Sequence, residues 1–113
     1  RYDQLLGELP VIRPYQSSDI YSALHLYPIQ IDVNNATVSR SQVFDTLRKG
    51  GIGANVHYIP VHTQPYYLEM GFAYGDFPVS ESYYYNAISL PLFPQMSFDD
   101  QDKVVTTLMS AFQ

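Results

Sequence analysis

The sequence predicts a single α+β domain in which three strands form one sheet and helices pack on one face of it. Three apolar segments have the length and residue types of strands, with helical periodicity between them: the expected strands are 24–33, 52–58 and 88–90. A helical crossover joins the first two strands, so they should be parallel, and the crossover should be right-handed. Inserting the third strand antiparallel between them gives a split βαβ sheet of order 1-3-2.

Composition limits the classes of partner. The chain has 113 residues, enough for one domain with a modest core, and a net charge of −5. This charge argues against nucleic acid, which needs a clustered basic surface. No apolar run is long enough to cross a bilayer, so we expect no membrane partner either. The absence of cysteine excludes disulfides and thiolate metal sites and is compatible with a reducing compartment. The start at Arg1, without methionine, suggests an excised fragment or a processed chain.

The first predicted elements are a short helix and an edge strand. Residues 1–9 carry apolar side chains at helical spacing. The segment 11–22 lacks periodicity and is expected to be an ordered connection. From 24 to 33 apolar and polar residues alternate, as in a strand with one buried face. Pro28 cannot donate to a ladder, which predicts an edge strand, and His25 within it is expected to be structural.

The next helix has the clearest local signals. Ser39 is a suitable N-cap, and Gln42 three positions later completes a capping box. Arg48 and Lys49 fall in the last turn, where cations suit the helix dipole, and Gly50-Gly51 ends the helix. Its expected buried stripe is Val43, Phe44 and Leu47.

The remaining elements are shorter, except the last. Residues 64–70 are expected to form a short helix, and Ser80 is expected to cap another of about seven residues. Ser97 is expected to cap a final helix with Asp99 and Asp100 in its first turn. The core-facing stripe of that helix is Val104, Val105, Leu108, Met109 and Phe112.

The candidate functional segment is Gly53–His62, which follows the second predicted strand. It places two imidazoles, a phenol and a proline within six positions. Most of the 11 tyrosines lie between Tyr58 and Tyr85, which predicts either half-buried rings at a surface or an interface or polar pocket. In the structural interpretation, His57 and Tyr58 only satisfy backbone groups where the chain turns. In the functional one, the segment is a binding element.

Other chemistries find little support in the sequence. His25, His57 and His62 lack the spacing and the acidic third ligand of a metal site, so no metal is expected. No serine lies in a nucleophile elbow. The glycines before Ala54 end a helix rather than open one, unlike a phosphate loop. Lys49 and Lys103 are expected on solvent faces, unsuited to a Schiff base.

Several ordered motifs resemble one family. They are Ser22-Ala23-Leu24-His25-Leu26-Tyr27, Gly51-Ile52-Gly53 leading to Val56-His57-Tyr58-Ile59-Pro60-Val61-His62, Gln64-Pro65-Tyr66-Tyr67, Gly75-Asp76-Phe77-Pro78 with Glu81, and Ile88-Ser89-Leu90-Pro91-Leu92-Phe93-Pro94. In this order they resemble the C-terminal domain of the pyridoxal-phosphate-dependent nucleotide-sugar aminotransferases of the DegT/StrS type. The resemblance covers essentially the whole chain. Its loop and its 88–94 segment are most similar to the 4-aminotransferases of the pseudaminic acid pathway.

This resemblance implies that residues 1–113 are the single small domain of a larger cytoplasmic fold type I enzyme, usually a homodimer. The implied reaction transfers an amino group from glutamate to C4 of a UDP-linked 4-keto-6-deoxy sugar, with pyridoxal phosphate as the electron sink. The residues that the resemblance assigns to the sugar-nucleotide site, for positioning rather than proton transfer, are His57, Tyr58, Ile59, Pro60, His62 and Tyr66. The cofactor lysine and phosphate cup belong to the family's large domain. The chain alone should therefore neither bind the cofactor nor transaminate.

Two functions from other classes remain open. A free-standing small-molecule-binding or regulatory module is compatible with a small α+β fold. A protein-interaction domain is compatible with the tyrosine-rich part of the chain. A preceding domain with a suitably placed lysine would favour the enzyme, and a start codon near Arg1 would favour the module.

Overall fold

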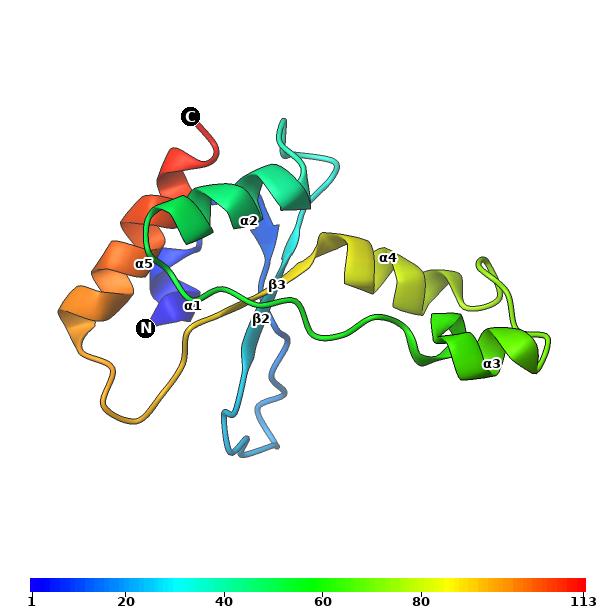
Figure 1. Ribbon diagram of the computed structural model, residues 1–113. Helices are drawn as coiled ribbons and strands as arrows, with labels where there is room; N and C mark the ends of the chain where they lie inside the picture. The colour runs from blue at the N-terminus through cyan, green and yellow to red at the C-terminus, as the bar shows by residue number, and fades with distance from the viewer.

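A small antiparallel sheet and two packed helices form the body of the molecule, and two further helices project from it (Figure 1). The computed structural model describes all residues, 1–113. Its elements are α1 (Tyr2–Leu5), β1 (Val11–Ile12), β2 (Tyr27–Ile31), α2 (Arg40–Lys49), the 3-10 helix η1 (Val61–Thr63), α3 (Pro65–Glu69), α4 (Pro78–Asn86), β3 (Ala87–Leu90) and α5 (Phe98–Ser110). The predicted α+β class with antiparallel neighbouring strands is confirmed. No helix combines the length and apolar composition that a bilayer-spanning helix needs.

The sheet has the order β1-β2-β3, and both pairs are antiparallel. The expected edge position of β2 is wrong, because the two-residue β1 pairs with its far side. That pairing reaches only Ile31 and Gln30, so the ladder on this side ends before Pro28. A proline without an N–H is therefore tolerated in the central strand. β1 is too short for its alternation to be read from sequence. Because β2 begins at Tyr27, His25 lies outside it, exposed in the preceding connection.

The second predicted strand, 52–58, is also wrong as a strand. It contributes one antiparallel bridge, Asn55 with Ser89, on the side of β3 opposite β2. This placement retains the expected order, with β3 between the two segments. The strand fails to extend because the Ala54 N–H donates to Ile52 O at 2.9 Å, a tight turn that interrupts the extended backbone. The residues around it, glycine, alanine and asparagine, also fit a pleated surface poorly.

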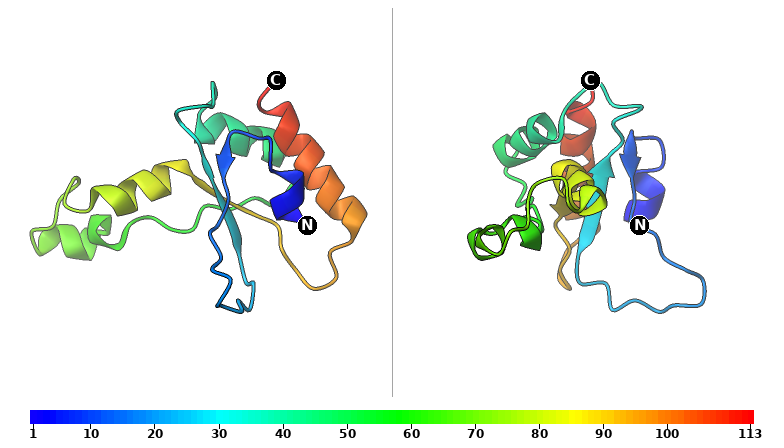
Figure 2. Two further views of the ribbon diagram at one scale, coloured as in Figure 1. Left: turned by 180° about the vertical axis from the view of Figure 1, so that it is seen from behind. Right: turned by 90° about the vertical axis from the view of Figure 1, so that its right-hand side faces the viewer.

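The core lies where α2 and α5 pack against the same face of the sheet (Figures 1 and 2). Side chains that are at most about 2% exposed come from four elements and from the turn after α1: Leu6, Ile29, Val43, Leu47, Ile88 and Leu108. In β2, the buried residues alternate with half-buried ones, as expected for a sheet with one core face. The predicted stripe of α5 is only partly buried, since Met109 is 44% exposed.

Helix capping follows the sequence signals at two of three predicted sites. Ser39 and Ser97 both form complete capping boxes, with Gln42 and Asp100 respectively. The predicted cap at Ser80 is wrong, because α4 begins two residues earlier, at Pro78, with Phe77 as the N-cap residue. Proline suits the first helical position, since its φ is already helical and its missing N–H would be unpaired there.

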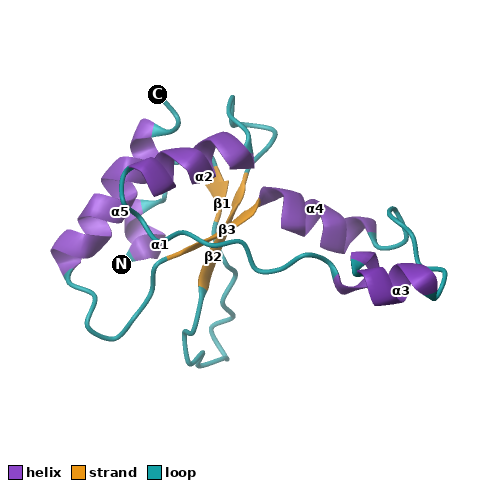
Figure 3. Ribbon diagram, in the orientation of Figure 1, coloured by secondary structure: helices purple, strands orange, loops and turns teal.

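Residues 61–86, here called the arm, carry η1, α3 and α4 away from the sheet (Figures 1 and 3). Neither α3 nor α4 contains a buried residue. Large apolar side chains that remain exposed along the arm include Tyr66, Met70, Phe72, Tyr74, Phe77 and Val79. The arm is attached to the body at two points, the loop before η1 and the direct continuation of α4 into β3.

Candidate functional site

The loop Gly53–His62 runs along the edge of β3 and then enters the arm. His57 is half-buried, and its Nδ1 lies 2.9 Å from Ser89 Oγ on β3. Tyr58 and Ile59 follow with 73% and 50% of their surface exposed. Pro60 is buried again. The peptide bond between His57 and Tyr58 is cis, and the two rings lie 4.6 Å apart between centroids. The loop thus presents two exposed residues between two held ones.

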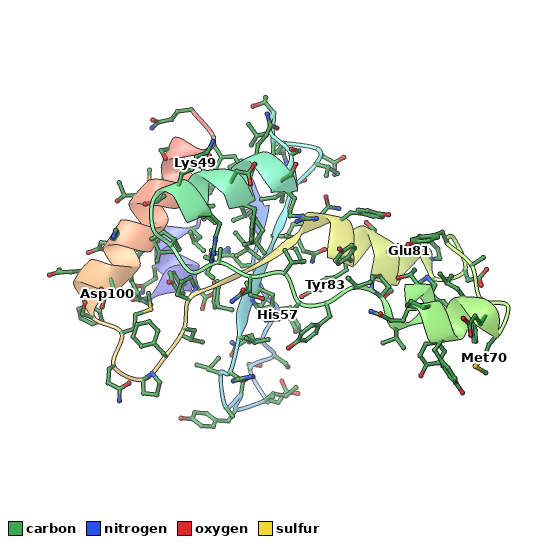
Figure 4. The ribbon with its side chains drawn as sticks, in the orientation of Figure 1. Lys49, His57, Met70, Glu81, Tyr83 and Asp100 are labelled. Carbon is green, nitrogen blue, oxygen red and sulfur yellow. The ribbon has the colours of Figure 1, made fainter.

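A cleft of about 480 Å³ lies beside this loop, between the end of β3, the segment that follows it and the start of α5. Its polar lining consists of Asn55, His57, Ser89, Asp100 and Lys103. Its apolar lining includes Leu26, Ile52, Leu92, Phe93 and Met96. A concave surface with an apolar wall and a few convergent polar groups is the usual form of a small-molecule site. In Figure 4, His57 lies below the middle of the sheet and Asp100 at the start of α5.

His62 lies elsewhere, inside the arm and away from the sheet, against Glu81, which is labelled on α4 in Figure 4. Only 7% of its side chain is exposed, and its Nε2 lies 2.8 Å from Glu81 Oε1. The ring of Phe77 packs against the imidazole at 4.8 Å between centroids. The backbone N–H of Gly75 donates to the same carboxylate oxygen at 2.7 Å. These hydrogen bonds, Gly75 first and His62 second, hold the pKa of Glu81 below its usual value.

The structure therefore does not gather the six predicted site residues into one cluster. His57 lines the cleft, Tyr58 and Ile59 face solvent beside it, and Pro60 is buried at the following turn. The buried position of His62 is described above. Tyr66, which is 67% exposed, lies on α3 of the arm. Of the six predicted residues, only His57 therefore lines the cleft.

Sequence reasoning missed five polar residues of the loop and its surroundings: Asn55, Ser89, Asp100 and Lys103 at the cleft, and Glu81 in the arm. The sequence does contain a signal for Ser89. Its side chain points to the face of the strand opposite to Ile88 and Leu90, and a hydroxyl buried there needs a hydrogen-bond partner. Lys103 is exposed on α5, as predicted for both lysines, but it also lines the cleft. No group of three or more His, Cys, Asp or Glu side chains is arranged to hold a metal ion.

Comparisons with known proteins identify the family of the chain. The family model described as the DegT/DnrJ/EryC1/StrS aminotransferase family matches residues 1–109. A curated relative, the spore coat polysaccharide biosynthesis protein SpsC of Bacillus subtilis, is 42% identical over 108 residues, which cover 93% of this chain and 28% of SpsC. The chain thus spans little more than a quarter of that relative.

Solved structures show the same fold. Spr1654 of Streptococcus pneumoniae, assigned as a sugar aminotransferase and solved in its PMP-form, aligns with a TM-score of 0.86 and 26% identity, over 97% of this chain and 28% of its own. PseC of Helicobacter pylori, an aminotransferase involved in the biosynthesis of pseudoaminic acid, aligns with a TM-score of 0.85 and 24% identity, over 98% of this chain and 30% of its own. The matching family model over almost all of the chain, together with these alignments, shows that this chain belongs to the DegT/DnrJ/EryC1/StrS aminotransferase family.

Proposed function

We propose that residues 1–113 are the C-terminal small domain of a larger pyridoxal-phosphate-dependent aminotransferase. The observation that carries this proposal is the family match over residues 1–109 combined with the share of about 28% that the chain covers in its relatives. The exposed apolar arm supports it as well, because large apolar patches on a soluble protein usually mark a surface covered by another part of the assembly. We expect the enzyme to be a cytoplasmic homodimer.

The residues of this chain do not fit pyridoxal phosphate on their own. A Schiff-base lysine needs desolvation or a cationic neighbour that lowers its pKa. Lys49 is exposed at the end of α2, and Lys103 is exposed with the carboxylate of Asp100 close by. The proposal therefore assigns the cofactor to the large domain and gives this chain a binding role.

In this role His57 is the central residue. Ser89 orients its imidazole through the 2.9 Å contact at Nδ1, and the other ring nitrogen, Nε2, forms no hydrogen bond within the chain. Tyr58 and Ile59 then supply a phenol and an apolar surface for the sugar ring or the nucleotide. These groups bind and orient the acceptor, and no proton transfer is assigned to them. Placing a substrate carbonyl correctly is worth a large part of a rate enhancement.

For the acceptor we propose a UDP-linked 4-keto-6-deoxy sugar, with glutamate as the amino donor, in the synthesis of cell-surface glycans. The sequences of residues 56–62 and 88–94, which resemble those of the pseudaminic acid pathway enzymes, support a UDP-linked acceptor. The identity with SpsC, a polysaccharide biosynthesis protein, supports the broader assignment.

The decisive experiment uses the full-length protein with pyridoxal phosphate and glutamate. UDP- and dTDP-linked 4-keto-6-deoxy sugars are supplied separately, and the 4-amino sugar is detected by mass spectrometry. We expect turnover with preference for the UDP sugar. A preference for the dTDP sugar would overturn the substrate assignment alone. No amino sugar from either substrate would overturn the enzymatic function.

A further inference from the structure

The exposed part of the loop is held from both of its ends. Upstream, Asn55 pairs with Ser89 through two backbone hydrogen bonds of 2.8 and 3.2 Å, and His57 adds the side-chain contact to the same serine. Downstream, Thr63 donates to Pro60 O twice, from its hydroxyl at 2.8 Å and its backbone N–H at 3.0 Å. Each of these two anchors includes buried residues: Ser89 upstream, and Pro60 and Thr63 downstream.

Between these anchors the loop makes few other contacts, and the main one is the packing of the Tyr58 ring on the His57 ring at 4.6 Å between centroids. The Tyr58 hydroxyl has no hydrogen-bond partner, and the side chain is mostly exposed. Ile59 is half exposed and lies outside the buried apolar cluster. The position of both side chains relative to the cleft therefore depends on the two ends of the loop, and a shift of either end moves them.

The downstream end depends in turn on Glu81. Its Oε1 accepts from His62 Nε2 and from the Gly75 N–H, and only 14% of the carboxylate side chain is exposed. Hydrogen bonds to an ionised acceptor in a poorly hydrated place are stronger than neutral, exposed ones. The carboxylate joins three segments: the η1 turn with His62, the tip of the arm with Gly75, and α4, which continues into β3.

Because α4 runs directly into β3, both anchors of the loop lead back to one continuous segment, from Glu81 to Ser89. Building on the function proposed above, we propose that Glu81 is a positioning residue of the sugar-nucleotide site. It holds His62, and through His62 it fixes the downstream end of the loop so that Tyr58 and Ile59 face the ligand. Glu81 itself touches no substrate in this role.

The test uses the full-length enzyme and two readouts. Glu81→Ala removes the acceptor, and we expect amide hydrogen exchange in residues 58–64 to become faster. We also expect the KM for the keto sugar to rise on the order of tenfold with a smaller change in kcat, as lost positioning predicts. Glu81→Gln keeps an acceptor oxygen at the same place, so its KM should stay close to that of the unaltered enzyme. The matched control is Glu69→Ala, which removes an exposed carboxylate from α3 of the same arm.

Further variants keep the proposal falsifiable. Should Glu81→Ala fail to fold, Glu81→Asp withdraws the carboxylate by one methylene and should raise exchange and KM in the same direction. If both variants fold, His62→Ala combined with Glu81→Ala should be no worse than Glu81→Ala alone, because Glu81→Ala already removes the contact with His62. Unchanged exchange in 58–64 would overturn the anchor. Faster exchange with an unchanged KM would overturn the role in substrate binding. The exchange measurement needs no activity, so failure of the anchor is distinguishable from failure of the proposed function, which inactivity of the unaltered protein would show.

Discussion

His57 Nδ1 and Ser89 Oγ lie 2.9 Å apart, although 32 positions separate the two residues in sequence. This contact joins the loop Gly53–His62 to β3, the strand that lies between β2 and the Asn55 bridge. A loop held on a rigid strand presents its side chains more precisely than a free one. The contact therefore gives two residues, His57 and Ser89, whose substitution in the full-length enzyme tests the role of the loop.

Replacing His57 by alanine in the full-length protein should raise the KM for the keto sugar more than it lowers kcat. The loss of one hydrogen bond of about 1 kcal/mol corresponds to a change of roughly fivefold. Ser89→Ala should act in the same direction with a smaller effect, because it releases the imidazole without removing it. Steady-state kinetics with each substrate varied measures both. The control is His25→Ala, because His25 is exposed in the connection before β2. An unchanged KM in His57→Ala would show that the loop is not part of the substrate site.

Position 50 requires glycine because of packing against α5, not because of its backbone conformation. A Cβ at this position would lie 2.5 Å from Thr107 Cγ2, while its φ of −75° suits any residue. We expect Gly50→Ala to lower the free energy of unfolding by about 1–3 kcal/mol in urea denaturation, the usual cost of overpacking. Thr107→Ser removes the clashing methyl and should recover part of the loss. Gly53→Ala, where a Cβ meets nothing within 4 Å, is the control, and equal losses at the two glycines would contradict the packing explanation.

Leu108 carries much of the contact between α5 and the core. It is fully buried, whereas its neighbour Met109 is 44% exposed. Leu108→Ala should reduce the free energy of unfolding by about 2–5 kcal/mol, through lost burial and the cavity left behind. Met109→Ala on the same helix should cost much less. A thermal or urea unfolding experiment on both variants checks the assignment, which similar losses would contradict.

The capping box of α5 should make the stability of the protein depend on pH in the acidic range. Hydrogen bonds from the Ser97 side chain and backbone, together with the charge of Lys103, hold the pKa of Asp100 below its ordinary value of 3.8. A carboxylate whose pKa is lower in the folded state stabilises the protein fully above its unfolded pKa. That contribution disappears as the pH falls through the folded pKa. The difference in Tm between the unaltered protein and Asp100→Asn should therefore be largest near neutral pH and shrink below pH 3.8.

The matched control for this pH dependence is Asp99→Asn. It removes the same charge from the same helical turn but no hydrogen bond to Ser97. A Tm difference for Asp100→Asn that stays constant down to pH 2, or equals that of Asp99→Asn throughout, would show that the cap does not carry the effect.

Local sequence signals determined the elements whose causes are local. The capping boxes at Ser39 and Ser97 need only residues three positions apart, and both formed as predicted. The alternation around Ile29 and the helical stripe through Leu108 gave the core faces, because side-chain period depends on the backbone alone. The ordered motifs also identified the family. By contrast, the start of α4 was misplaced because two compatible signals, Ser80 and Pro78, lie two residues apart.

Tertiary structure decided which of these residues act together. Nothing in the sequence places β1 beside β2, since a two-residue strand has no period. Nor does it show that His57 meets Ser89 while His62, five positions later, turns away to Glu81. The two histidines look equivalent in the chain, as members of one polar loop. They differ because the loop passes from the sheet edge into the arm between them, so that one imidazole lines a cleft and the other is buried in the arm against Glu81.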